Sequence, residues 1–213
     1  MVNLNTLPIN VITGNPKKLL KVARFLAYVF TKSNPVSVHL KLTEHDLYES
    51  KKPACLLKDT SAFTICKEDG TLLLAIMSTP LKNLEEALEQ IPNPPSFAPF
   101  DQVAAQCPIP RFLYEQKSMF LFGMGKLPIE DGGLPGGGLR LSNKALDFAR
   151  NAGFESCCAC LSSEGSQRIF LDRLGFIPYS KIAYAKSKVA QLEQFPGEYI
   201  VAYKKISMTR TNK

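Results

Sequence analysis

The stretch GMGKLPIEDGGLPGGGLRLSNKALDFAR, from Gly123 to Arg150, restricts the possible folds of this chain more than any other segment. It passes from an apolar segment through a glycine-rich loop into a segment with apolar residues at i, i+4, i+7 and i+8: Leu141, Ala145, Phe148 and Ala149. This spacing predicts a helix from Leu139 to Ala152 that packs one face on a sheet. Glycine loses more conformational entropy on folding than other residues do, so a cluster of glycines needs a reason. We expect that a ligand or another part of the chain approaches the backbone closely at this junction.

The predicted helix begins beside Gly138, and its first amides are expected to form an anion site. Such amides lack partners within the helix and lie at the positive end of its dipole, while glycines leave the backbone open to a phosphate or pyrophosphate. A flexible glycine-rich loop is the alternative. Two known phosphate loops are excluded, because Leu139-Arg140 stands where a Walker loop needs Lys-Ser/Thr, and Leu141 where the dinucleotide fingerprint needs glycine.

The rest of the chain alternates between predicted strands and helices. Strands are expected at 9–13, 61–77 (a hairpin that turns at Asp69-Gly70), 118–127, 154–161, 177–186 and 197–206. Helices are expected at 16–33, 43–57, 81–91, 139–152 and 165–174. The segment PNPPSFAPF (92–100) is expected to break regular structure, either as a loop over a pocket or as a spacer. The pattern indicates an α/β or α+β fold with a mixed sheet.

Length and composition indicate one soluble domain. The chain has 213 residues, 45% of them hydrophobic, which suffices for a sizeable core. We find neither an apolar stretch of membrane-spanning length nor a secretory signal, so a cytoplasmic protein is expected. The net charge of +7 favours an anionic partner. The basic residues are scattered, apart from KKPACLLK and the tail at 207–213, so a nucleic-acid-binding domain is only an alternative.

Six cysteines are few for a chain of this length, and three of them fall in the strand-like segment ESCCACL. Cys157 and Cys160 have C-x-x-C spacing, but residues three apart on a strand point to opposite faces and do not converge easily on one metal. We therefore expect reduced thiols in the core and no metal.

Two segments resemble the GCN5-related N-acetyltransferases. The loop Gly133-Leu134-Pro135-Gly136-Gly137-Gly138 is similar to the acetyl-CoA loop Q/R-x-x-G-x-G/A of that family at its fourth and sixth positions, with Gly133 in place of Gln or Arg. The segment CLSSEGSQRIFLDRLGF, from Cys160 to Phe176, is similar to the second CoA motif, in which a strand leads into a short helix that ends in LGF. The resemblance covers 119–206 well and the first hundred residues only by the order of elements.

The resemblance implies a single domain over 1–213 with a central mixed, mostly antiparallel sheet flanked by helices. Residues 1–118 would form the acceptor side and residues 119–206 the acetyl-CoA side, with 119–127 and 155–161 as adjacent strands. It implies acetyl-CoA as cosubstrate, a small amine as acceptor, and a monomer or homodimer. The residues implied at acetyl-CoA are Met124, Gly125, Lys126, Gly133, Gly136, Gly137, Gly138, Leu139, Ser166 and Phe170.

Within that superfamily, the SSEGS turn looks most like the invertebrate arylalkylamine N-acetyltransferase-like proteins. These carry paired serines with the spacing of Ser162 and Ser166, which makes the two serines candidate catalytic residues. Helix capping or contact with CoA is the simpler interpretation. The resemblance implies an arylalkylamine or a polyamine as acceptor. Tyr28, Phe30 and Phe97 are candidates for lining its pocket, although core packing explains each of them equally well.

Two departures from the family leave the proton-transfer groups unassigned. Leu171, or Phe170 after a slip of one residue, stands where many members have a tyrosine, and neither side chain can donate a proton. Because a thiol has a pKa of about 8.5, the CoA thiolate can leave without such an acid. Asn34 precedes Pro35 where the insect enzymes have a glutamate, and asparagine cannot act as a base. Glu44, Asp46 and Glu49 lie nearby in the sequence and could act through water. A CoA-binding protein with weak or lost catalysis is therefore an alternative.

Overall fold

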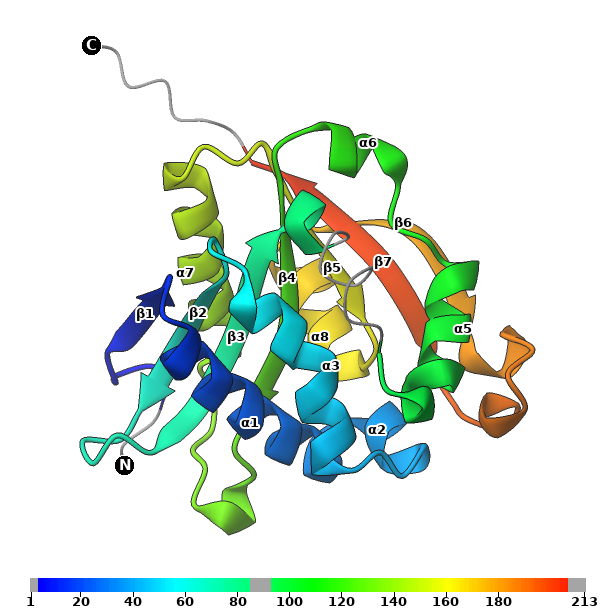
Figure 1. The fold of residues 1–213 in the computed structure, drawn as a ribbon, viewed down its shortest axis with the longest axis horizontal. Coiled ribbons are helices and arrows are strands. Elements are labelled where there is room, and N and C mark those ends of the chain that lie inside the picture. The colour runs from blue at the N-terminus through cyan, green and yellow to red at the C-terminus, as the bar shows by residue number, and fades with distance from the viewer. Residues whose placement is uncertain (1–3, 85–92, 207–213) are drawn as a thin grey trace.

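A computed structural model of the chain describes residues 4–84 and 93–206. It contains one seven-stranded sheet in the order β1-β2-β3-β4-β5-β7-β6 (Figure 1). The strands are β1 (Ile9–Thr13), β2 (Ser61–Cys66), β3 (Leu72–Pro80), β4 (Ser118–Lys126), β5 (Ser156–Leu161), β6 (Ile177–Ala183) and β7 (Glu198–Lys205). Strands β4 and β5 are parallel and the other neighbouring pairs are antiparallel. The expected mixed, mostly antiparallel sheet and the adjacency of 119–127 and 155–161 are confirmed.

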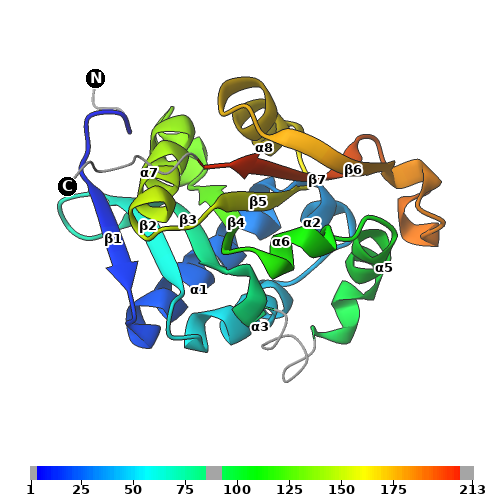
Figure 2. The same ribbon diagram turned by 90° about the horizontal axis from the view of Figure 1, so that it is seen from above.

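Helices cover both faces of the sheet (Figure 2). One face carries α1 (Pro16–Ser33), α2 (Pro35–His39), α3 (Glu44–Leu56), α5 (Ala98–Gln106) and α6 (Arg111–Glu115). The other carries α7 (Gly138–Asn151), α8 (Glu164–Gln167) and the π-helical segment Arg168–Arg173. Single 3-10 turns lie at Pro95–Phe97, Ile129–Asp131, Tyr184–Lys186 and Ala190–Leu192. Within the described part of the chain, no helix is both long and apolar enough to cross a membrane.

Local signals in the sequence fix several element boundaries. The Asn15 side chain accepts a hydrogen bond from the backbone N–H of Lys18 and caps α1, with Pro16 in the first turn. Helix α1 ends at Ser33, before the Asn34-Pro35 pair. Between β2 and β3, Gly70 has a φ of +85°, a conformation that glycine adopts without steric cost.

Two sequence predictions need correction. The helix expected over 165–174 consists of one α-helical turn, α8, followed by the π-helical segment. The segment PNPPSFAPF does not stay irregular, because α5 begins at Ala98 and Pro99 occupies its first turn, where no N–H is needed. Of the helix expected over 81–91, residues 81–84 are helical and the rest lies outside the described residues.

The sheet separates two apolar cores. On the face of α7, a large cluster joins that helix to the central strands; it includes Leu74, Ile76, Leu121, Leu141, Ala145 and Phe170. On the face of α1, a second cluster includes Leu19, Val22, Leu26, Ala62, Ala75 and Met77. The six cysteines are free thiols and four of them are buried: Cys55, Cys107, Cys157 and Cys158. Burial raises the pKa of Cys55 to about 12, which keeps that thiol protonated.

Gly125 lets α1 approach β4 closely. A Cβ at this position would lie 2.9 Å from a methyl of Leu26, 3.1 Å from the Phe30 ring and 3.1 Å from a methyl of Val29. The close approach of α1 therefore gives Gly125 a packing role beside the cofactor role that the resemblance implies.

We predict that Gly125→Ala lowers the free energy of unfolding by about 1–3 kcal/mol, because it overpacks the contact between α1 and β4. Gly165→Ala is the matched control, since a Cβ there would have no atom within 4 Å. Because Ala favours a helix over Gly, Gly165→Ala should not lower the free energy of unfolding. Urea unfolding measures both changes, and equal stability of the two variants would contradict the packing role of Gly125.

Candidate active site

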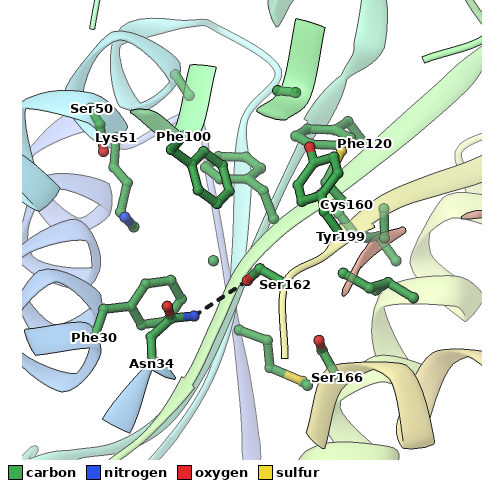
Figure 3. A pocket seen from close by; sticks show the side chains of 18 of the residues that line it. Phe30, Asn34, Ser50, Lys51, Phe100, Phe120, Cys160, Ser162, Ser166 and Tyr199 are labelled. Carbon is green, nitrogen blue, oxygen red and sulfur yellow. Dashed lines mark hydrogen bonds between the residues drawn. The ribbon is translucent and has the colours of Figure 1, made fainter. Parts of the chain in front are cut away.

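Strands β4 and β5 form a fork. They pair only from Ser118–Leu121 to Ser156–Ala159. Beyond these residues β4 continues along β3 as far as Lys126, while β5 continues along β7 as far as Leu161. A cavity of about 600 Å³ opens at the fork, between the two strands and the helices α1, α3 and α5 (Figure 3).

Among the described residues, eight aromatic side chains line this cavity. They are Phe30, Phe97, Phe100, Tyr114, Phe120, Phe122, Phe170 and Tyr199. Phe30 and Phe97 therefore line the cavity, as the sequence suggested. Tyr28 does not, because its hydroxyl donates a 2.8 Å hydrogen bond to Asp131 in the loop after β4. The cavity has the composition of a binding site for a planar or apolar group.

A bulge in β4 faces the cavity. Met77 pairs with Phe122 and Ala75 pairs with Gly125, which leaves Gly123 and Met124 opposite the single residue Ile76. Gly123 has a φ of +62°, and both bulge residues line the cavity. Of the segment that the resemblance assigns to the thioester, Met124 thus borders the cavity, whereas Gly125 and Lys126 are paired with β3 beyond it.

The glycines of the loop before α7 have different structural roles. A Cβ on Gly133 would lie 1.9 Å from the carbonyl oxygen of Leu127, so a side chain such as Gln or Arg has no room there. Gly137 is buried with a φ of +86°, and a Cβ there would lie 2.7 Å from Leu4. Gly136 has a φ of +80° and is exposed. Of Gly133, Gly136 and Gly137, Gly136 is thus the one whose backbone is exposed to solvent.

The start of α7 fits a pyrophosphate. Among the described residues, no side chain caps the first amides of this 14-residue helix, which begins at Gly138 and Leu139. Arg140 points elsewhere, because its guanidinium donates to the carbonyl oxygens of Leu4 and Leu7 at 2.9 and 2.5 Å. A Cβ on Gly138 would lie 4.0 Å from the sulfur of Met124, so this helix end adjoins the fork. Uncapped amides next to the cavity match what a CoA pyrophosphate needs.

The two predicted serines have different partners. Ser166 forms a capping box with Ser163, in which each side chain accepts from the other residue's backbone N–H, and its hydroxyl donates to the Ser163 carbonyl at 2.7 Å. Ser162 instead accepts a 3.3 Å hydrogen bond from the side-chain amide of Asn34 (Figure 3). All of these residues except Ser163 were singled out from the sequence, and the fold brings Asn34 and both serines to one end of the cavity. The hydrogen bonds of Ser166 are those of a helix cap.

The acidic residues considered as bases lie away from the cavity. Asp46 forms a capping box with Thr43, whose hydrogen bonds hold the pKa of that carboxyl below its usual value. Glu49 forms an ion pair with Lys52. Neither these two nor Glu44 lines the cavity that the described residues form.

Lys51 and Asp101 are the only charged residues among the described residues that line the cavity. Asp101 lies on the exposed side of α5 and accepts a 2.9 Å hydrogen bond from Asn93. Partial burial raises the pKa of the Asp101 carboxyl. Lys51 is 8% exposed, and burial lowers the pKa of its ammonium to about 8.

Sequence analysis did not single out Lys51, although a signal was present. Lys51 follows Leu47 by four residues and precedes Ala54 and Cys55 by three and four, so it lies in the buried stripe of α3. A lysine in an apolar stripe is either paired or placed at a cavity.

The seven-stranded sheet, the fork between β4 and β5, and the glycine loop before α7 together define the fold of the GCN5-related N-acetyltransferases. Arylalkylamine N-acetyltransferase 2 from Aedes aegypti is similar over 93% of this chain and 99% of its own, with 18% identity and a TM-score of 0.66. The polyamine N-acetyltransferase of Drosophila melanogaster, which forms N-acetylagmatine, is similar over 93% of this chain and 100% of its own, with 16% identity and a TM-score of 0.67.

The same fold occurs in a domain that is described as a condensation domain. The C-terminal condensation domain of Ebony, solved with β-alanyl-dopamine, is similar over 94% of this chain and 100% of its own, with 12% identity and a TM-score of 0.62. No protein-family model and no curated protein matches the sequence. Identities from 12% to 18% establish the fold and leave the reaction to be inferred from the site.

We predict that Asn34→Ala lowers the free energy of unfolding by about 1 kcal/mol, because the Asn34 side chain also caps α2. Its carbonyl oxygen accepts from the backbone N–H and the hydroxyl of Ser37, both at 3.0 Å. Asn34→Asp keeps this acceptor and should stay within about 0.5 kcal/mol of the unsubstituted protein. Urea unfolding of both variants checks this, and an Asn34→Ala protein of unchanged stability would contradict it.

Proposed function

We propose that this protein is an acetyl-CoA-dependent N-acetyltransferase that acetylates the primary amine of a small arylalkylamine by direct attack on the thioester. The observation that carries the proposal is the aromatic cavity at the fork of β4 and β5, with the uncapped start of α7 beside it. Acetyl transfer requires the amine and the thioester to be held together out of bulk water, and the fork provides one space for both.

The glycine loop supports acetyl-CoA as the donor. The amides at the start of α7 would donate hydrogen bonds to the pyrophosphate, and the bulge at Gly123 and Met124 would lie beside the thioester in the fork. Amides directed at the developing oxyanion would stabilise the tetrahedral intermediate. The condensation domain of Ebony has the same fold, so the loop rather than the fold is the reason to propose CoA.

The cavity lining supports an aromatic acceptor over a polyamine. A polyamine carries two or more positive charges, which need several carboxylates when they leave water. The described lining offers one carboxylate, the exposed Asp101. Its other ionisable side chain of opposite type, Lys51, is basic and cannot pair with a second positive charge. An arylalkylamine carries one charge and a ring, and eight aromatic side chains surround the space that the ring would occupy: Phe30, Phe97, Phe100, Tyr114, Phe120, Phe122, Phe170 and Tyr199.

The experiments below also distinguish two alternative functions. Asn34 in place of a glutamate favours a CoA-binding protein with weak or lost catalysis. The net charge of +7 favours a nucleic-acid binder, which would bind DNA or RNA with steep salt dependence and be indifferent to CoA.

We predict that Gly136→Val raises the dissociation constant of CoA by more than about tenfold, equivalent to about 1.4 kcal/mol, because a side chain at the loop would obstruct the pyrophosphate. Gly70→Val is the matched control, since Gly70 has nearly the same φ, +85° against +80°, and lies in the β2–β3 hairpin. Both variants should lose stability through the strained φ, and Gly136→Val should lose somewhat more because a Cβ there would also lie 3.2 Å from Asn5. Only Gly136→Val should lose CoA affinity. Calorimetric titration measures the affinity, and equal affinity in the two variants would contradict the loop as the CoA site.

We predict that the protein releases free CoA thiol from acetyl-CoA when 2-phenylethylamine is added, with a higher kcat/KM than for spermidine. Thiol detection measures the rate, and the rate without amine is the control for hydrolysis. A preference for spermidine would contradict the assignment of the acceptor class. Tight CoA binding without turnover of any amine would identify the protein as a CoA binder that is not an acetyltransferase.

A further inference from the structure

The proposed reaction, on which this inference rests, needs a group that takes a proton from the acceptor. An alkylamine is protonated at neutral pH, and its ammonium has no lone pair with which to attack a thioester. The carboxylate that the resemblance implies before Pro35 is replaced by Asn34, whose amide donates to Ser162. Neither an amide nor the hydroxyl of Ser162 is a useful base at this pH.

Lys51 is the basic group that the fold places in the cavity. Its Nζ donates a 3.2 Å hydrogen bond to the Leu47 carbonyl and lies 4.7 Å from the centroid of the Phe30 ring. Its Cε lies 3.6 Å from the position that a Cβ on Gly123 would occupy, so the amine is next to the bulge in β4. Figure 3 shows the Lys51 side chain reaching from α3 into the space between Phe30, Phe100 and Ser162.

The other titratable groups around Lys51 are less suited to accept the proton. Cys55 lies one turn further along α3, and burial raises the pKa of its thiol, as it does for Cys160 on β5 and Tyr199 on β7. These three groups are therefore protonated at neutral pH. From α5 the cavity receives Asp101, whose carboxylate accepts a hydrogen bond from Asn93 that stabilises its ionised form and opposes protonation. From α6 it receives the phenol of Tyr114. Among the described residues, no carboxylate forms an ion pair with Lys51.

We propose that Lys51 is the catalytic proton acceptor of this protein. Neutral Lys51 takes one proton from the acceptor ammonium, and the freed nitrogen lone pair forms a bond to the thioester carbonyl carbon. When the tetrahedral intermediate collapses, the carbon–sulfur bond breaks, and the second proton of the nitrogen ends on the CoA sulfur. The Lys51 ammonium, held by the Leu47 carbonyl and the face of Phe30, then returns its proton to water. Burial, which lowers the pKa of Lys51 to about 8, keeps a useful fraction neutral at pH 7.

A pair of isosteric acceptors tests this role. The amine of 2-phenylethylamine is protonated at pH 7, whereas that of O-benzylhydroxylamine is already neutral and needs no base before attack. We expect Lys51→Met to lower kcat/KM for 2-phenylethylamine by about 100-fold at pH 7, a typical loss for a removed general base. For O-benzylhydroxylamine the loss should be below about threefold, because that acceptor needs no deprotonation. Lys52→Met, which removes a half-exposed lysine of the same helix that pairs with Glu49 away from the cavity, should change neither rate.

The pH profile and a second variant separate a base from a fixed charge. With Lys51 present, kcat/KM for 2-phenylethylamine should rise with pH up to about 8, as Lys51 loses its proton, and then level off. Lys51→Met should remove this break, and the rate should keep rising towards the pKa of the acceptor. Lys51→Arg keeps the charge but cannot release its proton at these pH values, so it should behave like Lys51→Met. Thermal unfolding and CoA titration confirm that each variant folds and binds CoA, and Lys51→Gln replaces any variant that does not.

Several results would overturn the role of Lys51. Activity retained in Lys51→Arg but lost in Lys51→Met would mean that Lys51 acts through its charge. Equal losses with both acceptors would mean that it acts in binding or packing. Full activity of Lys51→Met with 2-phenylethylamine would remove Lys51 from catalysis and leave the proposed acetyl transfer intact. Absence of turnover in the unsubstituted protein with both acceptors, despite CoA binding, would contradict the proposed function and Lys51 with it.

Discussion

The parallel pairing of β4 with β5 ends after Leu121 and Ala159, and the position of the cavity depends on where it ends. Each strand then keeps its hydrogen bonds with its other neighbour, β3 or β7, so the fork opens without leaving the sheet. The bulge at Gly123 and Met124 lies directly beyond the divergence point on β4. On the sheet face that carries α1, the absence of a side chain at Gly125 lets that helix pack close to β4. Helix α1 in turn packs on α3, which carries Lys51. The backbone geometry of β4 thus decides which side chains surround the cavity.

The glycine loop shows how one dense motif can serve several purposes. Gly133 is required by the turn after β4, where the Leu127 carbonyl fills the space of a side chain. Gly137 is required by the packing of Leu4 and Leu74 against the backbone. Only around Gly136 and the first turn of α7 does the backbone stay open to solvent. The entropy cost of the glycines is therefore offset partly by the protein's own packing, and a ligand would use the part that is left.

Element boundaries were predictable from the sequence where a local signal sets them. Asn15-Pro16, Asn34-Pro35 and Asp69-Gly70 act through caps and turns that involve a few neighbouring residues, so they could be read directly. Helix α5 was missed because prolines are usually helix breakers, whereas Pro99 lies in the first turn of a helix that starts at Ala98, where no N–H is needed.

The lining of the cavity was less predictable, because segments far apart in the sequence form it. Tyr28 and Phe30 are two residues apart on α1 and point in different directions, one to Asp131 and the other into the cavity. Both were candidates from the sequence, which does not show which of the two side chains points into the cavity. Lys51 could have been noticed in the apolar stripe of α3, but its place beside the β4 bulge depends on the packing of α1 and α3 on the sheet.

The measurement that tests the proposed site most directly is an NMR titration of the nitrogen-15-labelled protein with CoA. If the pyrophosphate binds at the start of α7 and the thiol lies in the fork, the backbone amide signals of residues 136–139 and of Met124 should shift together with one dissociation constant. The signal of Gly70, in the β2–β3 hairpin, should not move. Shifts that leave residues 136–139 and Met124 unchanged at saturating CoA would contradict a CoA site at the fork of β4 and β5.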